Sequence, residues 1–398
     1  MSRKKRKKSL LFKKITRREF IKLAGATMLG LSFGGYLIKN FVLNKAPVAL
    51  NNSLKVAVSK KHTKEVYFYT RLAGDIVRCD TCPHNCKLSA GQRGICRVKE
   101  NVGGKLISFV YGNPCAVHID PVEKKPLYHF LPTTKVFSIA TAGCNFRCLN
   151  CQNWEISQFP PEKTYNSDMM PTEVVSNAIA AKCASIAYTY SEPVAFYEYM
   201  LDTSKLAKEN NIKNLWITNG YLAEKPLIEL SKYIDAANVD LKSFKDSIYA
   251  KLNSGTLQPV LNTLKTLKKQ GVWLEVTNLV VPSYTDDLDM IKQMCKWLYD
   301  NLGADTPLHF SRFYPHYKLR HLPPTPYSTL KKARDIALKA GLHYVYVGNV
   351  LELEGQQTYC PKCGKVVVKR EGYDIKEVNI VDGKCKFCGY RIAGVWSL

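Results

Sequence analysis

The sequence is poor in acidic residues. Asp and Glu number 33 against 58 Lys and Arg in 398 residues, which gives a formal net charge of +25. About half of this excess lies in residues 1–45, where thirteen Lys or Arg accompany a single acid, Glu19. The basic charge is therefore concentrated at one end of the chain rather than spread over a binding surface, which argues against nucleic-acid binding.

The sequence also lacks a long hydrophobic run. Its longest apolar stretch, residues 23–38, falls short of the roughly 20 residues of a membrane-spanning helix. It follows a basic run with an Arg pair, Arg17 and Arg18, a polar residue before the pair, and Phe20, Ile21 and Lys22 after it. This pattern resembles a twin-arginine export signal, a route used by folded proteins already loaded with cofactor. Residues 1–45 are predicted to be such a signal or a membrane anchor.

Cysteine, in contrast, is abundant. Eleven of the fourteen cysteines fall in three tight clusters, which is more than packing requires. A disulfide framework is typical of short, loop-rich secreted chains, whereas this sequence contains long amphipathic helical stretches. The clusters therefore indicate metal sites.

Between the first and last cysteine clusters, short apolar runs alternate with amphipathic stretches. The predicted strands are 136–140, 185–190, 214–218, 237–241, 272–281 and 307–310, with 343–347 as a candidate seventh. The predicted helices are 172–181, 195–209, 224–233, 260–269, 288–301 and 328–340. This alternation indicates right-handed βαβ units and a parallel sheet. We expect an α/β fold with a partial (β/α)6 TIM-like barrel, and a doubly wound open sheet is the alternative.

The middle cysteine cluster directly follows the first predicted strand. Cys144, Cys148 and Cys151 form a C-x3-C-x2-C motif. Three thiolates on one loop can hold three irons of a [4Fe-4S] cubane and leave the fourth iron without a protein ligand. An open iron can chelate the methionine part of S-adenosylmethionine (SAM), so that one electron cleaves the S–C5′ bond and yields a 5′-deoxyadenosyl radical. Zinc with a distant fourth ligand is the alternative, but the position after the first strand favours the cluster.

Several further motifs surround these cysteines, in residues 78–86, 91–96, 118–127, 151–157, 188–193 and 238–244. With them, about residues 65–398 resemble the radical SAM enzyme of the AmmeMemoRadiSam system, a relative of the pyruvate formate-lyase activating enzymes. The resemblance implies a radical SAM barrel over 131–350, preceded by a linker and Cys-rich segment over 46–130 and followed by a CxxC…CxxC ribbon over 351–398.

The resemblance also implies residues that contact SAM. Ser191 and Glu192 occupy the place that meets the SAM amino group. The other implied contacts are Asn219, Asp240, Lys242, Glu275, Thr277 and Asn278, at later strand ends. The usual aromatic residue before the third cysteine, near the adenine, is Asn150 here. Each of these residues has an ordinary alternative role as a hydrogen-bonding residue of the barrel rim or as a helix cap.

Two further cysteine sets flank the barrel. The first comprises Cys79, Cys82, Cys86 and Cys96, and either zinc or a second iron–sulfur cluster fits these four thiolates. The second comprises Cys360, Cys363, Cys385 and Cys388, and a Gly follows each of its CxxC pairs. This spacing is typical of a zinc ribbon, with a rubredoxin-like iron site as the alternative.

The sequence therefore predicts a radical SAM oxidoreductase that abstracts hydrogen from an unknown substrate. It would act as a glycyl-radical-enzyme activase or as a modifier of another polymer or small molecule. A non-catalytic electron-transfer or metal-binding module is the alternative. Expected partners are a flavodoxin- or ferredoxin-type electron donor and Memo-like and AMMECR-like proteins or a glycyl radical enzyme. The signal predicts a protein directed to the cell envelope, either tethered at the cytoplasmic face, where SAM is available, or exported.

Overall fold

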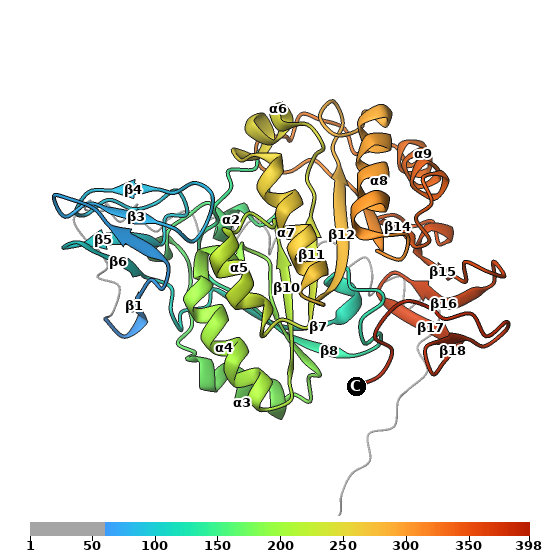
Figure 1. Ribbon diagram of the computed structural model, residues 1–398, viewed down its shortest axis with the longest axis horizontal. Coiled ribbons are helices and arrows are strands. Elements are labelled where there is room, and N and C mark those ends of the chain that lie inside the picture. Colours follow the sequence, from blue (N-terminus) through green and yellow to red (C-terminus); the bar gives the residue numbers. More distant parts are fainter. Residues whose placement is uncertain (1–59) are drawn as a thin grey trace, which may run out of the picture. The chain divides into compact units, whose positions relative to one another are not determined.

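An eight-stranded mixed sheet is the centre of the computed structural model, which describes residues 60–398 (Figure 1). Its strands, in chain order, are β7 (Ala116–Pro121), β8 (Lys135–Ala140), β9 (Ser185–Tyr188), β10 (Lys213–Thr218), β11 (Ala236–Asp240), β12 (Trp273–Val280), β13 (Leu308–Arg312) and β14 (Val345–Gly348). Strands β8 to β14 are parallel and lie in sequence order, whereas β7 pairs antiparallel with β8. The order has no switch point, so the sheet is not doubly wound.

One helix of eight or more residues follows each of the first six parallel strands, as the periodicity predicts, and the short helices α2 (Trp154–Ser157) and α6 (Asp246–Ile248) precede two of them. These helices are α3 (Pro171–Ala180), α4 (Tyr197–Glu209), α5 (Glu224–Ser231), α7 (Leu257–Lys269), α8 (Leu288–Leu302) and α9 (Tyr327–Lys339). Helix α3 packs on α4, α5 on α7, α7 on α8, and α8 on α9, and Tyr197 of α4 donates a hydrogen bond of 2.8 Å to the Pro226 carbonyl of α5 (Figure 1). The predicted βα alternation is confirmed, with end points that differ by a few residues.

Both faces of the parallel sheet are covered, which explains its nearly continuous apolar strands. On β10, Trp216 belongs to the core shared with the helices, and its neighbour Leu215 belongs to a separate core on the opposite face. Leu215 lies in register with Ala187 on one side and Ala236 on the other. Apolar residues of segment 122–131, between β7 and β8, cover this second face.

Smaller sheets precede and follow the large one. Residues 64–108 form the three-stranded sheets β1-β6-β5 and β2-β3-β4, with strands β1 (Lys64–Glu65), β2 (Tyr69–Arg71), β3 (Val77–Cys79), β4 (Lys87–Leu88), β5 (Lys99–Val102) and β6 (Lys105–Ser108). The C-terminal module contains β15 (Thr358–Tyr359), β16 (Val366–Glu371), β17 (Asp374–Val378), β18 (Ile380–Val381) and β19 (Lys384–Cys385). This module contacts the segment before β8, because Arg370 Nη2 donates a hydrogen bond of 2.8 Å to the Tyr128 carbonyl.

Strand β7 is absent from the predicted strands. It is an edge strand with two exposed residues in succession, His118 and Ile119, so its burial does not alternate as a half-buried strand would. The large sheet therefore takes one strand from the segment predicted to be Cys-rich. The predicted export signal lies outside the described residues. Within residues 60–398, no helix is both long enough and apolar enough to cross a membrane.

Candidate active site

The three cysteines of the C-x3-C-x2-C motif lie on the loop that leaves the carboxyl end of β8. Cys144 is buried, and Cys148 and Cys151 are partly buried. Burial raises the pKa of each thiol, to about 11 for Cys151, and the neighbouring thiols of the motif raise the pKa of Cys144 further. Three thiols on one loop are the donor set that a [4Fe-4S] cluster with an open iron requires.

The loop is held by the chain that follows β11. The Arg147 and Leu149 amides donate hydrogen bonds of 2.9 Å to the carbonyls of Asn253 and Leu252. These acceptors belong to a single π-helical turn, η5 (Tyr249–Asn253). A π-helical turn is a rare feature that often marks functional sites, and no periodicity in the sequence predicts it.

Two hydrogen bonds reach the cysteine sulfurs directly. The Phe146 amide lies 3.2 Å from Cys144 Sγ, and Asn253 Nδ2 lies 3.0 Å from Cys148 Sγ. Asn253 is fully buried. Hydrogen bonds to ligand sulfurs tune the reduction potential of a cluster, so Asn253 is a functional residue that the sequence motifs did not single out.

Glu192 lies at the carboxyl end of β9 and is engaged by protein donors. Its carboxylate accepts from Thr218 Oγ1 at 2.7 Å, from the Asn219 amide at 2.8 Å and from the Val194 amide at 3.1 Å. Burial raises the pKa of Glu192 to about 7, although these donors oppose the shift. Glu192 also contributes to the raised pKa of Cys144, so it faces the cysteine loop.

Asn219 connects the β10 end to the cysteine loop. Its Nδ2 donates to Asn145 Oδ1 at 2.8 Å, and its Oδ1 accepts from the Tyr221 amide at 2.9 Å. Asn145 in turn donates to the Tyr221 carbonyl at 2.9 Å. Asn219 therefore positions the loop through Asn145, an amide that the sequence analysis did not single out.

Asp240 and Lys242 lie at the carboxyl end of β11 as an ion pair, with Lys242 Nζ 2.9 Å from Asp240 Oδ2. Burial opposes the charge of Lys242, but Asp240 and Cys148 raise the pKa of its ammonium group. The same ammonium group lowers the pKa of Cys148 and Cys151. Lys242 therefore supplies a positive charge beside the anionic ligand set.

Glu275, Thr277 and Asn278 all lie on β12, but their side chains have different surroundings. Glu275 accepts from the Tyr128 and His129 amides at 3.1 and 2.8 Å and from His309 Nε2 at 2.7 Å. Its carboxylate thus anchors the segment before β8 and is not free for a ligand.

The other two β12 residues, Thr277 and Asn278, differ in whether they line a cavity. Asn278 donates to the Leu241 carbonyl at 2.7 Å and is fully buried. Thr277 donates to Asn238 Oδ1 at 2.8 Å and also lines a cavity of about 460 Å³. Of the three predicted contacts on β12, Thr277 alone lines that cavity.

The 460 Å³ cavity lies between the strand ends of β12 to β14 and the C-terminal module. Gln152, next to Cys151, forms part of its lining, and Gln356 and Tyr373 contribute the wall from the C-terminal module. Glu123 also lines it; this residue is 1% exposed, and its Oε2 has no hydrogen-bond partner within the described chain. The volume is typical of a small-molecule site, and one lining residue, Gln152, directly follows the third cysteine of the motif.

The buried polar atoms near the cysteine loop that have no partner in the described part of the chain include Ser191 Oγ and Asn150 Oδ1. Buried polar atoms are normally satisfied, so an unpaired one calls for a ligand or water. Both belong to residues that the resemblance places at SAM. The donor set and these two atoms fit a [4Fe-4S] cluster with SAM bound to it.

A sequence model of the radical SAM superfamily matches residues 138–298. An uncharacterized protein of Methanocaldococcus jannaschii is 50% identical over 331 residues, which cover 83% of this chain and 98% of that protein. The chain belongs to the radical SAM superfamily. The matched range contains all three motif cysteines together with Glu192 and Lys242. As a radical SAM enzyme, the protein cleaves SAM at an iron–sulfur cluster.

Radical SAM relatives with named activities are more distant. The pyruvate formate-lyase 1-activating enzyme of Escherichia coli K12 is 24% identical over 213 residues, which cover 50% of this chain and 87% of that enzyme. A solved radical SAM methyltransferase from Sphaerobacter thermophilus matches with a TM-score of 0.44 and 13% identity, over 60% of this chain and 71% of that one. The predicted similarity to the activating enzymes is confirmed, at a distant level.

The four C-terminal cysteines of this radical SAM enzyme come together as predicted. The ligand atoms of Cys360, Cys363, Cys385 and Cys388 all lie within 4.8 Å of one another. Two of the sulfur–sulfur distances are 3.6 and 3.8 Å. A tetrahedral ion with metal–sulfur bonds of about 2.3 Å has edges of about 3.8 Å, so these thiols can share one metal ion.

The N-terminal cysteines gather on the β2-β3-β4 sheet and the turns around it. Cys79 ends β3, and its amide donates 2.9 Å to the Cys86 carbonyl just before β4. Burial raises the pKa of Cys82, and Cys79, Cys96 and Cys86 raise it further, so the four thiols are neighbours.

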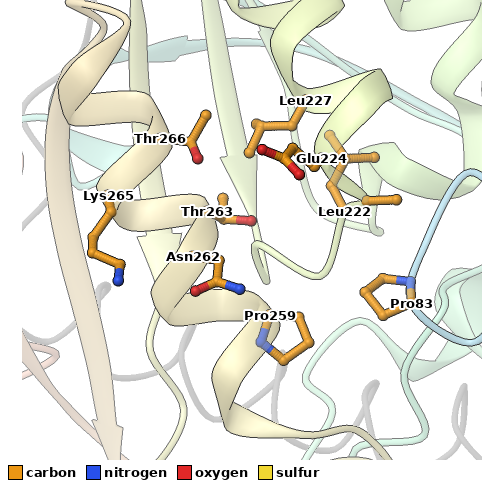
Figure 2. A pocket seen from close by; sticks show the side chains of 10 residues that line it. Pro83, Leu222, Glu224, Leu227, Pro259, Asn262, Thr263, Lys265 and Thr266 are labelled. Carbon is orange, nitrogen blue, oxygen red and sulfur yellow. The ribbon is translucent and has the colours of Figure 1, made fainter.

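A groove of about 400 Å³ on the outer helical layer is separate from this chemistry (Figure 2). It lies between α5 and α7, and Asn262 and Thr266 of α7 face Glu224 and Leu227 of α5 across it. No cysteine lines it. Pro83, which follows Cys82, forms one side, so the groove marks where the N-terminal cysteine segment meets the helices.

Proposed function

We propose that this radical SAM enzyme is the SAM-cleaving component of an AmmeMemoRadiSam system and abstracts hydrogen from a substrate bound in the 460 Å³ cavity. When bound, a [4Fe-4S] cluster on Cys144, Cys148 and Cys151 supplies the electron that breaks the S–C5′ bond of SAM. The cysteine loop at the carboxyl end of β8 carries this proposal, because it bears the three thiols and because Gln152, which directly follows Cys151, lines the cavity.

The chain's own residues would hold SAM around this loop. Ser191 Oγ and Asn150 Oδ1 are buried and unpaired among the described residues, so each has hydrogen-bonding capacity left for SAM. Glu192, Asn219 and Lys242 fix the loop and its charge rather than filling the cavity. Polar atoms preset in this way would bind SAM without rearrangement of the loop.

The test is SAM cleavage by the full-length protein after anaerobic reconstitution with iron and sulfide. With dithionite and SAM, we expect 5′-deoxyadenosine by chromatography. Replacing Cys144, Cys148 or Cys151 singly by Ala should abolish the product. The matched control is Cys295→Ala, because Cys295 is a fully buried core thiol of α8 outside the motif. Product formation that survives the loss of a motif cysteine would contradict the proposal.

The similarity to a pyruvate formate-lyase activating enzyme favours activase chemistry as one form of this function. In that form the substrate is a glycine of a partner enzyme, and mixing the two should leave a glycyl radical visible by electron paramagnetic resonance. The cavity, walled by the C-terminal module, favours a small molecule or a narrow polymer segment instead. Multiple-turnover release of a modified small product would exclude the activase form.

The partners and the location follow from the same chemistry. A flavodoxin- or ferredoxin-type protein would supply low-potential electrons, and Memo-like and AMMECR-like proteins would act with the enzyme. The C-terminal ribbon would hold zinc, or iron as the alternative, with a structural or docking role. Residues 1–45 would direct the protein to the cell envelope, at the cytoplasmic face where SAM is available.

A further inference from the structure

Two of the N-terminal cysteines, Cys86 and Cys96, lie on either side of Gly94 in the chain and have sulfurs close to it in space. A Cβ at this position would lie 3.6 Å from Cys86 Sγ and 3.8 Å from Cys96 Sγ. The chain at Gly94 therefore lies close to both sulfurs. Cys79 and Cys82 are each only 8% exposed, and Cys86 and Cys96 are partly buried.

The spacing of this set differs from that of the C-terminal ribbon. Among residues 60–398, only the ribbon brings three or more candidate ligand atoms within 4.8 Å of one another. The cluster ligands Cys144, Cys148 and Cys151 are thus more widely spaced, and so are the N-terminal four. In a cubane each thiolate binds a different iron, whereas around a single ion the sulfurs are only about 3.8 Å apart. The wider spacing fits a cluster better than it fits zinc.

A buried cation lies beside the N-terminal set. Lys99 is 2% exposed, and its Nζ lies 3.1 Å from Glu198 Oε1 and 3.0 Å from Thr81 Oγ1. Burial opposes its charge, but Glu198, Cys79 and Cys96 together raise the pKa of the ammonium group. A fully buried lysine needs compensating negative charge; Glu198 is its ion-pair partner, and thiolates at the N-terminal set would add to that negative charge.

The set also touches the radical SAM loop. His84 Nε2 lies 2.8 Å from the Asn145 carbonyl, and Arg147 donates 3.2 Å to the Ile95 carbonyl. A Cβ at Gly143, next to Cys144, would lie 2.6 Å from the Cys96 carbonyl oxygen. Three contacts thus join the two cysteine segments without an intervening layer. Zinc has no redox chemistry, whereas an iron–sulfur site at this place would lie against the redox centre of the enzyme.

We propose that Cys79, Cys82, Cys86 and Cys96 hold a second [4Fe-4S] cluster with four thiolate ligands, packed against the loop of the first. Because all its irons are bound by cysteine, this cluster does not bind SAM. The inference goes beyond the proposed function and does not depend on which substrate the enzyme uses.

The test counts iron, acid-labile sulfide and zinc per full-length chain after anaerobic reconstitution. The triple variant Cys144→Ala/Cys148→Ala/Cys151→Ala should keep about half of the wild-type iron and sulfide, roughly four atoms of each. After reduction with dithionite it should show a cluster signal by electron paramagnetic resonance that SAM leaves unchanged. Adding Cys79→Ala and Cys86→Ala should remove the remaining iron and sulfide.

Controls separate loss of the cluster from loss of the fold. Cys183→Ala removes a buried thiol outside all three sets and should keep the full iron content. Metal retained at the C-terminal ribbon reports that each variant is folded. The proposal would be overturned by a triple variant that contains no acid-labile sulfide but holds a second zinc ion in addition to that of the C-terminal ribbon. It would also be overturned by a reduced wild-type protein whose entire cluster signal changes on addition of SAM, a measurement that needs no variant. The 5′-deoxyadenosine assay on wild-type protein tests the proposed function separately.

Discussion

Replacing Asn253 by Leu should make the cluster on Cys144, Cys148 and Cys151 harder to reduce. Asn253 is fully buried, and its Nδ2 lies 3.0 Å from Cys148 Sγ. An N–H group directed at a ligand sulfur stabilises the extra negative charge of the reduced cluster. Leu has the same number and branching of side-chain heavy atoms but no donor, so the change removes the hydrogen bond while keeping the branching of the side chain.

The size of the effect follows from the strength of one hydrogen bond. A single bond contributes about 0.5–1.5 kcal/mol net, and 1.36 kcal/mol corresponds to about 59 mV for one electron. If the bond acts mainly in the reduced state, the potential should fall by about 20–65 mV. At a fixed solution potential where the cluster is mostly oxidised, the reduced fraction then falls by about two- to twelvefold, and the rate of 5′-deoxyadenosine formation falls with it.

A redox titration followed by electron paramagnetic resonance measures this shift. Iron content must equal that of the wild type, which shows that the loop still holds its cluster. Asn262→Leu is the matched control, because Asn262 is an exposed amide of α7 on the outer groove. An unchanged or more positive potential in Asn253→Leu would refute the assignment of this amide as a tuning group.

Further predictions concern the loop, acid stability and a buried ion pair. Gly143→Ala, at φ +96°, should lose iron, because the added Cβ would lie 2.6 Å from a backbone oxygen. Gly271→Ala, at φ +76° in open space, should keep its iron and lower the free energy of unfolding by about 1–2 kcal/mol. Equal iron content in the two variants would contradict this prediction. Burial lowers the pKa of His129 to about 4, so the unfolded state binds more protons between about pH 6.5 and 4. Unfolding free energy should therefore fall by up to about 3 kcal/mol as the pH drops through this window, and His129→Gln should remove that slope. Glu198→Ala leaves a buried lysine unpaired and should cost about 3–5 kcal/mol in urea, whereas Asp300→Ala, in an exposed pair, should cost less than about 0.5 kcal/mol.

The sequence predicted the large sheet well because its strands are local and apolar. Strands such as β9 are buried along their whole length, so their apolar runs reveal them without knowledge of their partners. Edge strand β7 is different, because its pairing with β8 depends on long-range contacts rather than on its own pattern. The same reason explains the π-helical turn η5, which depends on the cysteine loop packed against it.

The candidate site was predictable where metal ligation fixes the spacing of residues in the sequence. The cysteines of the C-x3-C-x2-C motif must lie on one loop, and they do. The roles of single polar residues were harder to predict, because a carboxylate can serve a ligand or the protein. Glu275 shows this: its predicted SAM contact conflicts with its bonds to two backbone amides and to His309. Asn253 could not be found from sequence, since only the fold brings it to Cys148.

The contact between Arg370 and Tyr128 joins residues 242 positions apart, and the contact between His129 and Ala393 spans 264 positions. Contacts of such long separation close large loops and form after the local βα units. The C-terminal module should therefore dock last, on a sheet that is already complete. In mild denaturant the C-terminal module should also detach first. This detachment would remove one wall of the 460 Å³ cavity while the helical circular dichroism signal stays unchanged.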